Sequence, residues 1–450
     1  MTVQTIGARG KERSATRWSR TKALVPSERR PFVYGALVVF SFLYYYRPED
    51  FIGLLAYIPM ARIAGVLGLV ALIAGMAGTR SKIPTAVKML WLLLLQMTLC
   101  IPTALWRGGA FSTVFEKFAK GVIVAMLISM SVVAVRELRK LLWLQVSAVA
   151  LVVFFSIAFR HFRDGRLQGI QKGILENPND LAINIAISFP LGLAFMLHAR
   201  GLKKVVWAVA LAVMCLGLVL TYSRSGLLAF ILAIMVCVWE YGIKGKRRSL
   251  VITTVVIMVL GMCAALSTAH YRARVESIVM GNVEGSGDKG SLEARKALLK
   301  KSISVTLHHP LFGVGPGCFV MVDKGWVVAH NSYTELSSES GIPALVLFLL
   351  AMGAGFRNIA FVRKSQKYRD DPELKLFTQA LWAGLAAYMA GACFASTEYN
   401  LYPYFMIGYT CAAVRIVSQA LPAQAQGSKD SGLVKTNYDR IRRTQPVWSR

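Results

Sequence analysis

One arginine lies where a membrane-embedded chain would least tolerate an unpaired charge. Arg224 stands within the short stretch Tyr222–Gly226, between two long apolar runs. Such an arginine either reaches the lipid headgroups at a tight hairpin or is held at the mouth of a helix bundle to bind an anionic group. Ionisable residues in such places mark functional sites by default, so we favour the anion-binding interpretation.

A histidine is the second candidate for chemistry. His330 ends a short apolar stretch and precedes Asn331. A neutral imidazole with a pKa of about 6.5 is suited to act as a general base, although a lone histidine is more often structural. His308 and His309 compete for this role, but Pro310 follows them directly and favours a structural turn.

Other charged side chains have more than one interpretation. Arg295, in a segment with helical spacing, and Arg166 would lie on solvated faces if they bind no ligand. The carboxylates of Glu49 and Asp50 could bind a metal ion, but Arg47 lies beside them and favours an interfacial charge pair. No external cluster of His, Asp and Glu has convincing ligand spacing, so we predict neither a metal site nor another cofactor.

The composition indicates which elements position these side chains. The sequence has 450 residues, of which 55% are hydrophobic, and a mean hydropathy of +0.50. Apolar runs of about 20 residues recur along it, the length that a helix needs to cross a bilayer. Only helices and closed barrels satisfy their backbone in lipid, and the runs are too long for barrel strands. The sequence therefore predicts an all-α polytopic membrane protein.

We predict about twelve transmembrane helices, which puts both termini on the same side. Their approximate ranges are 32–47, 58–78, 86–106, 119–135, 140–159, 180–198, 205–223, 226–243, 250–269, 342–361, 376–396 and 401–419. The resulting division is a basic tail at 1–31, nine helices within 32–269, a large loop at 270–341, three helices within 342–420 and a disordered tail at 421–450.

The distribution of charge predicts the side that each loop faces. The chain has 52 Lys and Arg against 23 Asp and Glu. With both tails in the cytoplasm, most basic residues fall on that side, as the positive-inside rule expects. The loop at 270–341 then lies on the opposite side. This distribution also argues against nucleic-acid binding, because the basic residues are spread over loops and tails where they meet the lipid bilayer.

The loop at 270–341 is too long to be a simple connector. Within it we expect a helix from Leu292 to about Val305 that Ser291 could cap. A rigid, turn-rich stretch follows at 309–317. A short helix at 331–340 would then lead into the tenth span.

Four short motifs follow one another between about residues 160 and 350. They are Asn177–Ala182, Tyr222–Gly226, His309–Gly317, and Ala329–Tyr333 followed by Glu339–Gly341. Together they resemble the motifs of the O-antigen ligase / O-antigen polymerase superfamily. Each motif alone is weak, but four in this order on one side of the membrane are specific.

The resemblance implies a membrane-embedded glycosyltransferase of the C type in the bacterial inner membrane. Its donor would be a glycan linked to undecaprenyl pyrophosphate at the periplasmic face. The acceptor would be the lipid A–core for a ligase, and another lipid-linked repeat for a polymerase. A protein O-glycosylation ligase is a further alternative, because the motifs do not name the acceptor.

The resemblance also implies roles for particular residues. The essential histidine of the family maps onto His330 and two essential arginines map onto Arg224 and Arg295. These guanidiniums would neutralise the departing pyrophosphate without a metal. His330 would accept the proton of the attacking hydroxyl, and the displacement would invert the anomeric configuration.

Three further residues complete the predicted site in the loops on that side. Arg166 is a further candidate for the pyrophosphate, while Asn331 and Glu339 would have supporting roles.

A transporter or flippase for the same lipid-linked glycans is the alternative from another class. Twelve spans suit such a protein, but a transporter should place ionisable residues near the membrane midplane. The charges of the predicted spans, such as Arg62 and Lys88, lie near span ends. This pattern favours surface chemistry over alternating access.

Overall fold

The chain folds into a bundle of helices with a single small β-hairpin among the described residues. The computed structural model describes residues 31–47, 63, 65–70, 73, 82–169, 175–245, 249, 253, 288–322 and 327–419. Most of the spans expected at 58–78 and 250–269 lies outside the described residues. The two predicted tails, Glu49, Asp50 and the first part of the loop at 270–341 also lie outside them.

The first half of the described chain is a series of helices that ends in the hairpin. It consists of α2 (Pro31–Tyr46), α5 (Thr85–Cys100), the 3₁₀ turn η2 (Ile101–Thr103), α6 (Arg107–Ser112), the π-helical turn η3 (Thr113–Phe118), α7 (Ala119–Ser131), α8 (Val135–Ala158), β1 (Phe162–Arg163) and β2 (Arg166–Leu167). The two strands pair antiparallel, with Arg163 opposite Arg166.

The regular elements of the second half, as far as it is described, are all helices. It consists of α9 (Pro178–His198), α10 (Leu202–Leu220), α11 (Arg224–Cys237), the π-helical turn η4 (Val238–Ile243), α14 (Asp288–His308), α15 (Phe319–Val322), α16 (Ser332–Lys364), α17 (Gln366–Asp370) and α18 (Pro372–Gly391). A last helix occupies residues 402–419.

Six of the described helical stretches are long and apolar enough to cross a membrane. They are Thr85–Thr103, Val135–Ala158, Pro178–His198, Leu202–Leu220, Arg224–Ile243 and Ser332–Lys364. Each begins or ends within a few residues of a predicted span, apart from the polar start of α16. The chain is therefore an all-α, membrane-embedded protein. The total of twelve spans and the side that the large loop faces stay predictions.

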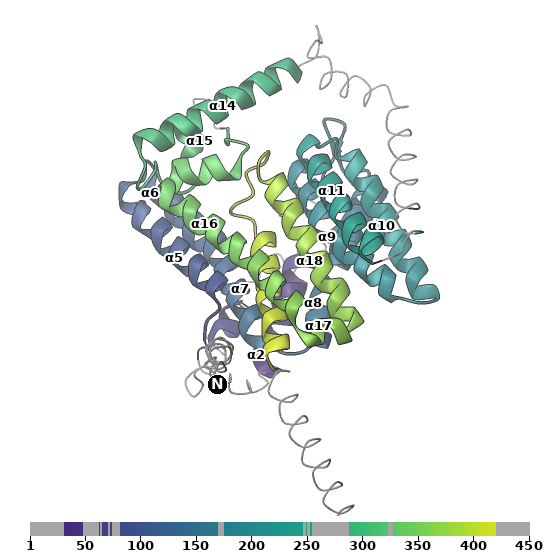
Figure 1. Ribbon diagram of the computed structural model, residues 1–450. Helices are drawn as coiled ribbons and strands as arrows, with labels where there is room; N and C mark the ends of the chain where they lie inside the picture. Colours follow the sequence, from purple (N-terminus) through teal and green to yellow (C-terminus); the bar gives the residue numbers. More distant parts are fainter. Residues whose placement is uncertain are drawn as a thin grey trace, which may run out of the picture.

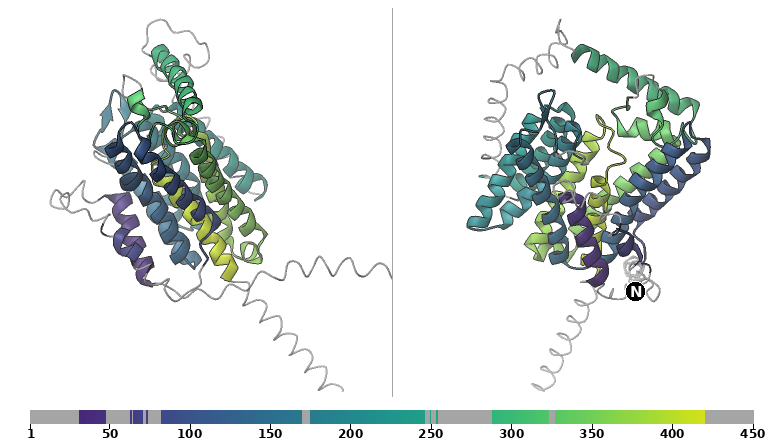
Figure 2. Two further views of the ribbon diagram at one scale, coloured as in Figure 1. Left: turned by 90° about the vertical axis from the view of Figure 1, so that its left-hand side faces the viewer. Right: turned by 180° about the vertical axis from the view of Figure 1, so that it is seen from behind.

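Burial distinguishes the centre of the bundle from its rim. In α9, 83% of the most apolar 18-residue window is buried, against 22% in α10. α9 packs against α10, α11 and α18, while α16 packs against α5. α14 extends across one end of the bundle and contacts α16 (Figures 1 and 2). The end of the bundle beside α14 is where the predicted site residues gather.

α14 and α16 differ from the sequence-based expectation at their starts. α14 begins at Asp288 rather than Leu292, so Ser291 lies inside the helix and is not its cap. The short helix expected at 331–340 and the following span form the single element α16, with a break at Gly341. The helix expected from Leu292 to about Val305 therefore exists as α14, but it is longer than predicted.

The break in α16 accommodates the turn-rich segment at 309–317. Gly341 has a φ of 81°, and a Cβ there would lie 2.2 Å from the carbonyl oxygen of Leu311. Glycine alone fits this backbone conformation and this close approach. The segment then pairs with α16 through backbone bonds, with Val314 donating to Ser338 at 2.9 Å.

Candidate active site

His330 occupies a strained backbone position directly before α16. Its φ is +55°, in the left-handed region that residues with a side chain seldom adopt. Such a conformation costs about 1–3 kcal/mol and persists only where the surrounding structure enforces it. The contacts that hold the His330 backbone are therefore part of the site.

A buried carboxylate and a hydroxyl hold this backbone in place. The His330 N–H donates to the Ser396 hydroxyl at 3.1 Å. Glu335, in the first turn of α16, accepts from the Ala329 N–H at 2.9 Å and from the Ser396 hydroxyl. We call the side chains of Glu335 and Ser396 the His330 clamp. Motif reasoning did not find either residue.

Asn331 connects the stretch at 327–331, which we call the His330 loop, to the residues that follow α18. Its side chain caps α16 by accepting from two backbone N–H groups of the first turn, at 3.0 and 3.1 Å. Its amide nitrogen donates to the carbonyl of Cys393 at 3.0 Å. The next residue, Ser332, donates through its N–H to the carbonyl of Ala392 at 2.9 Å. Asn331 is thus placed as a supporting residue of the His330 loop.

Glu339 fastens the glycine-rich segment to α16. Its buried carboxylate accepts from the N–H groups of Gly317 at 2.7 Å and Phe319 at 3.0 Å. It also accepts from the hydroxyl of Tyr399. These contacts join the motif that contains Glu339 to the end of the motif His309–Gly317, and they give Glu339 a structural part in the site.

Arg295 acts on His330 from the side of α14. The pKa of His330 is lowered from 6.5, first by burial of the imidazole and second by the positive charge of Arg295. Both effects disfavour the protonated ring. Arg295 therefore lies near enough for its charge to act on the imidazole, and both effects favour the neutral ring.

Arg224 lies at a tight turn between α10 and α11, as predicted. We call residues 221–224 the Arg224 turn. α10 ends at Leu220 and α11 begins at Arg224. The Ser223 hydroxyl caps α11 by accepting from the Gly226 N–H at 3.2 Å. A Cβ on Gly226 would lie 2.2 Å from the Cβ of Ala182, so the glycine allows α11 to approach α9 closely.

Arg166 supports this turn from the β-hairpin. Its Nε donates to the carbonyl of Thr221 at 2.9 Å, and one terminal nitrogen donates to Oδ1 of Asn179 at 2.9 Å. The same oxygen accepts from the Ser223 hydroxyl at 2.9 Å. The motif Asn177–Ala182 thus contributes a hydrogen-bonding side chain and a small residue to the Arg224 turn.

The Arg224 turn and the His330 loop lie at the same end of the bundle. A Cβ on Gly391, the last residue of α18, would lie 3.4 Å from the Cβ of Ala229 in α11. Ala392 and Cys393, which follow α18 directly, accept the hydrogen bonds of the His330 loop. The end of α18 therefore packs against the first half of α11, and the residues that follow it bind the His330 loop.

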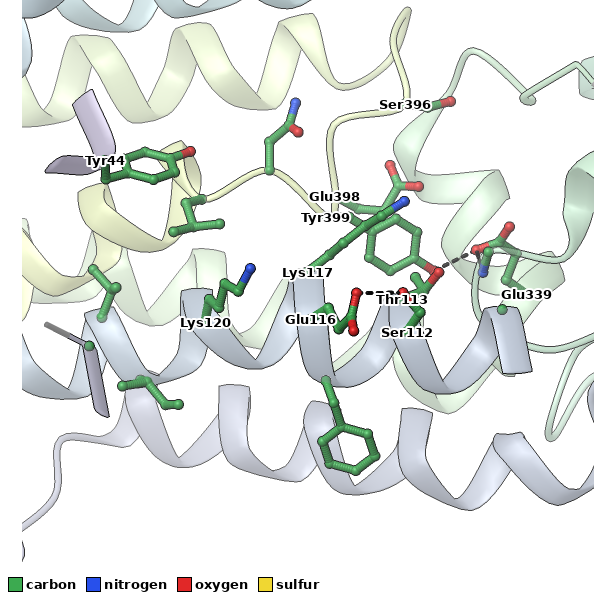
Figure 3. Close-up of a pocket in the computed structure, with 18 of the residues that line it drawn as sticks. Tyr44, Ser112, Thr113, Glu116, Lys117, Lys120, Glu339, Ser396, Glu398 and Tyr399 are labelled. Atoms are coloured by element: carbon green, nitrogen blue, oxygen red, sulfur yellow. Dashed lines mark hydrogen bonds between the residues drawn. The ribbon is translucent and has the colours of Figure 1, made fainter. Parts of the chain in front are cut away.

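A cavity of about 1070 Å³ adjoins the His330 clamp. Glu335 and Ser396 form part of its wall, together with Glu339, Glu398 and Lys117 (Figure 3). Burial, followed by the negative charge of Glu339, raises the pKa of Glu398 to about 8. Among the described residues, no three His, Cys, Asp or Glu side chains are placed to hold a metal ion.

Residues 209–349 match the family model described as O-antigen ligase. The match supports the O-antigen ligase superfamily for this segment. It begins in α10, ends in α16, and contains Arg224, Arg295 and His330. The family indicates an enzyme of the ligase or polymerase kind that acts on lipid-linked glycans. No curated protein matches the chain.

The matched segment leaves out several residues that support the His330 loop, Glu339 or the Arg224 turn. Ser396, Cys393 and Tyr399 lie after the matched segment, and Arg166 and Asn179 lie before it. The sequence offered little signal for Ser396, because 376–396 reads as one apolar span. The structure ends α18 at Gly391, and the following loop contacts the His330 loop.

Proposed function

We propose that the protein is an O-antigen ligase-type glycosyltransferase. It would transfer a glycan from undecaprenyl pyrophosphate to an acceptor hydroxyl, with the lipid A–core as the first candidate, at the periplasmic face of the bacterial inner membrane. The observation that carries the proposal is that the segment matching O-antigen ligases contains a half-buried His330 in a strained backbone position, with its pKa lowered by burial and by the charge of Arg295.

His330 would act as the general base. The acceptor oxygen attacks the anomeric carbon while the bond from that carbon to the pyrophosphate oxygen breaks, and the hydroxyl proton passes to the imidazole. A single displacement of this kind inverts the anomeric configuration. The lowered pKa of His330 supports this role, because the ring must be neutral before the proton arrives.

The departing pyrophosphate would be stabilised by guanidinium groups rather than by a metal. Planar guanidiniums make paired, charge-assisted hydrogen bonds to phosphate oxygens. Arg224, on its short turn, and Arg295, on α14, are the two candidates. Arg166 was predicted as a third, but its bonds to Thr221 and Asn179 support a positioning role beneath the Arg224 turn.

The decisive experiment is a transfer assay with the purified protein in nanodiscs. The substrates are a glycan on undecaprenyl pyrophosphate and lipid A–core, and the products are separated by size and by lipid anchor. Transfer of glycan to the core by the wild type, together with its loss in His330→Ala, would support the ligase. Elongated glycan that stays on undecaprenyl pyrophosphate would instead identify a repeat-unit polymerase.

Two further alternatives have their own readouts. Transfer to a co-purified protein substrate, with the core untouched, would identify a protein O-glycosylation ligase. Cells with His330→Ala or Arg224→Ala could instead keep full transfer activity and accumulate lipid-linked glycan in the cytoplasmic leaflet. That result would identify a transporter or flippase.

A further inference from the structure

A large groove lies at the end of the bundle opposite to the candidate site. Its volume is about 1910 Å³, and it lies between α8 and α10, with parts of α2, α9 and α18 completing the wall. α9 begins near the Arg224 turn and ends at His198, and α10 runs back from Leu202 to that turn. The short connection from α9 to α10 is therefore at the end of the bundle far from α14 (Figure 1). No residue with a proposed role in glycan transfer lines this groove.

Basic side chains from three helices surround the mouth of the groove. Arg139 and Lys140 lie near the start of α8, His198 ends α9, and Lys203 lies in the first turn of α10. Among the described residues, no aspartate or glutamate lines the groove. Arg139 is paired with Glu373 at 3.1 Å, but Lys140 and Lys203 form no ion pair with a described side chain. Two ammonium groups are thus available to an anionic ligand.

The groove becomes apolar beyond its mouth. Leu151 and Phe154 line it from α8, and Val206 and Val209 line it from α10. Between 41% and 59% of each of these four side chains is exposed. The protein itself therefore leaves a long apolar surface uncovered directly beneath a ring of positive charge.

The few polar groups along the wall are satisfied within the protein. The hydroxyls of Tyr46 and Ser147 lie 2.7 Å apart and form a hydrogen bond. Trp207 stacks on Phe195, with ring centroids 4.8 Å apart. Trp143, which is 47% exposed, lies one turn from the basic mouth, where tryptophan is enriched in membrane proteins. A ligand in the deeper part of the groove needs to supply only apolar contacts.

The length of the groove corresponds to one leaflet of a bilayer. From Lys140 to Phe154, α8 rises by about 21 Å at about 1.5 Å per residue. Half of a bilayer, headgroups included, is about 20–22 Å thick. At the inner end, a Cβ on Gly217 of α10 would lie 2.2 Å from the side chain of Val153 in α8, so the two helices meet there. A lipid of one leaflet fits this length, whereas a partner helix that crosses the bilayer would be too long.

We propose that this groove binds one anionic phospholipid of the leaflet opposite to the candidate site. The phosphate would accept hydrogen bonds from the ammonium groups of Lys140 and Lys203, and an acyl chain would lie along Leu151 and Val206. Basic pockets between transmembrane helices are known to suit such headgroups. With both tails in the cytoplasm, as the charge distribution predicts, this leaflet is the cytoplasmic one. The inference does not depend on the proposed transferase function.

A lipid in the groove would support the least buried of the six candidate spans. Only 22% of the most apolar window of α10 is buried, and the far end of α10 leads into the Arg224 turn. A molecule held between α8 and α10 covers part of this exposed face. Because a ligand that binds only the folded state stabilises it, the melting temperature should depend on the lipid headgroup.

Tryptophan quenching tests whether the lipid occupies the groove. The purified protein in dodecyl maltoside micelles is titrated with phosphatidylglycerol that carries bromine on its acyl chains, and in parallel with phosphatidylcholine that carries the same chains. Phosphatidylglycerol should quench the fluorescence saturably and at a lower lipid concentration. The double variant Trp143→Phe/Trp207→Phe should lose this saturable component, because both indoles line the groove.

Charge variants test the headgroup contact. Lys140→Met and Lys203→Met should each weaken phosphatidylglycerol binding by about fivefold, as expected for one basic residue near an anionic lipid, and leave phosphatidylcholine binding unchanged. Lys204→Met is the matched control, since Lys204 is the exposed neighbour of Lys203 and does not line the groove. Equal affinities for the two lipids, or wild-type affinity in both Lys140→Met and Lys203→Met, would overturn the proposal.

Thermal melting in nanodiscs gives an independent readout. Phosphatidylglycerol in a phosphatidylcholine nanodisc should raise the melting temperature of the wild type and of Lys204→Met, and raise that of Lys140→Met/Lys203→Met less. Glycerol 3-phosphate, which has the phosphate without acyl chains, should not displace the brominated lipid. Full displacement by glycerol 3-phosphate would identify a site for a free anion and contradict the lipid assignment.

Discussion

The His330 loop and the Arg224 turn lie at the same end of the bundle, but different forces hold them. Buried polar groups hold the His330 loop, since Glu335 and Ser396 bind the backbone around a left-handed histidine. Close packing of small residues holds the Arg224 turn, where Gly226 lies against Ala182. Hydrogen bonds from Arg166 reinforce that turn from outside the helix pair.

The difference follows from what each side chain would have to do. A general base needs a pKa that suits the working pH, so nearby charge and burial matter as much as position. A pyrophosphate-binding arginine keeps its charge at any physiological pH and needs only a fixed location. The comparison predicts that variants of the two regions will fail in different ways.

The largest effect is expected from His330→Ala. Loss of a general base should lower the transfer rate by about 10²–10⁴-fold, because the variant lacks the proposed proton acceptor. Binding of the undecaprenyl-linked donor, measured by fluorescence titration, should stay near the wild-type value. The control is His309→Ala, at an exposed position in the neighbouring turn. A similar loss of rate in this variant would contradict a specific role of His330 as the base.

Replacement of Arg224 should affect the leaving group rather than the base. Arg224→Met is expected to lower kcat by about 10²–10³-fold, as for loss of a preorganised donor at a developing negative charge. Arg224→Lys should recover only part of this, because an ammonium lacks the planar fork. Neither variant should move the pH profile. Arg200→Met, at an exposed position after α9, serves as the control. A shifted pH profile in Arg224→Met would show that Arg224 also affects the base, contrary to this prediction.

The clamp can be loosened without touching the imidazole. Glu335→Gln and Ser396→Ala each weaken the contacts that enforce the His330 backbone, so kcat should fall by up to about 10²-fold. The acceptor hydroxyl would then meet a displaced base, while donor affinity should be unchanged. Single-turnover kinetics give both values. Normal kcat in both variants would mean that α16 alone positions the histidine.

Arg166→Ala should act on the opposite region and more weakly. It removes two hydrogen bonds beneath the Arg224 turn, which we expect to cost about 1–3 kcal/mol of stability and to raise the KM for the donor. Arg163→Ala, opposite Arg166 in the same hairpin, is the matched control. A pH–rate profile like that of the wild type would confirm that the His330 region is undisturbed.

The smallest and most specific effect is a pH shift in Arg295→Gln. The positive charge of Arg295 contributes to the lowered pKa of His330, so its removal should raise that pKa. A protonated imidazole cannot act as a base, and the acidic limb of kcat/KM should therefore move to higher pH. Arg295→Lys should restore the limb. An unmoved limb would show that burial alone sets the pKa.

The helices were accessible from sequence because lipid imposes a simple rule on them. Long apolar runs predicted α8 to α11 within a few residues, and the absence of spacer residues predicted the tight turn at Arg224. Polar buried segments obey no such rule. The end of α18 was missed because Ala392–Ala395 are as compatible with a span as with the irregular loop that accepts bonds from Ser332.

For the site as well, the sequence predicted some residues and missed others. His330 and Arg224 belong to recognisable motifs, and Arg295 was predicted from the family resemblance; its charge acts on the imidazole of His330. Glu335 has no such signal, because it is one carboxylate among several polar residues in the first turns of α16. Its role depends on Ser396, 66 residues after the histidine whose N–H that hydroxyl receives. Only the tertiary fold shows this contact.

The polar start of α16 also constrains how the chain matures in the membrane. Glu335 and Glu339 are buried, yet Ser396 and Tyr399, which donate to them, lie beyond α18 in the chain. When the polar start of α16 leaves the ribosome, those hydroxyl donors have not yet followed it. The His330 loop can therefore reach its native conformation only after the chain beyond α18 has been made, so the synthesis of this last part determines when the loop is complete.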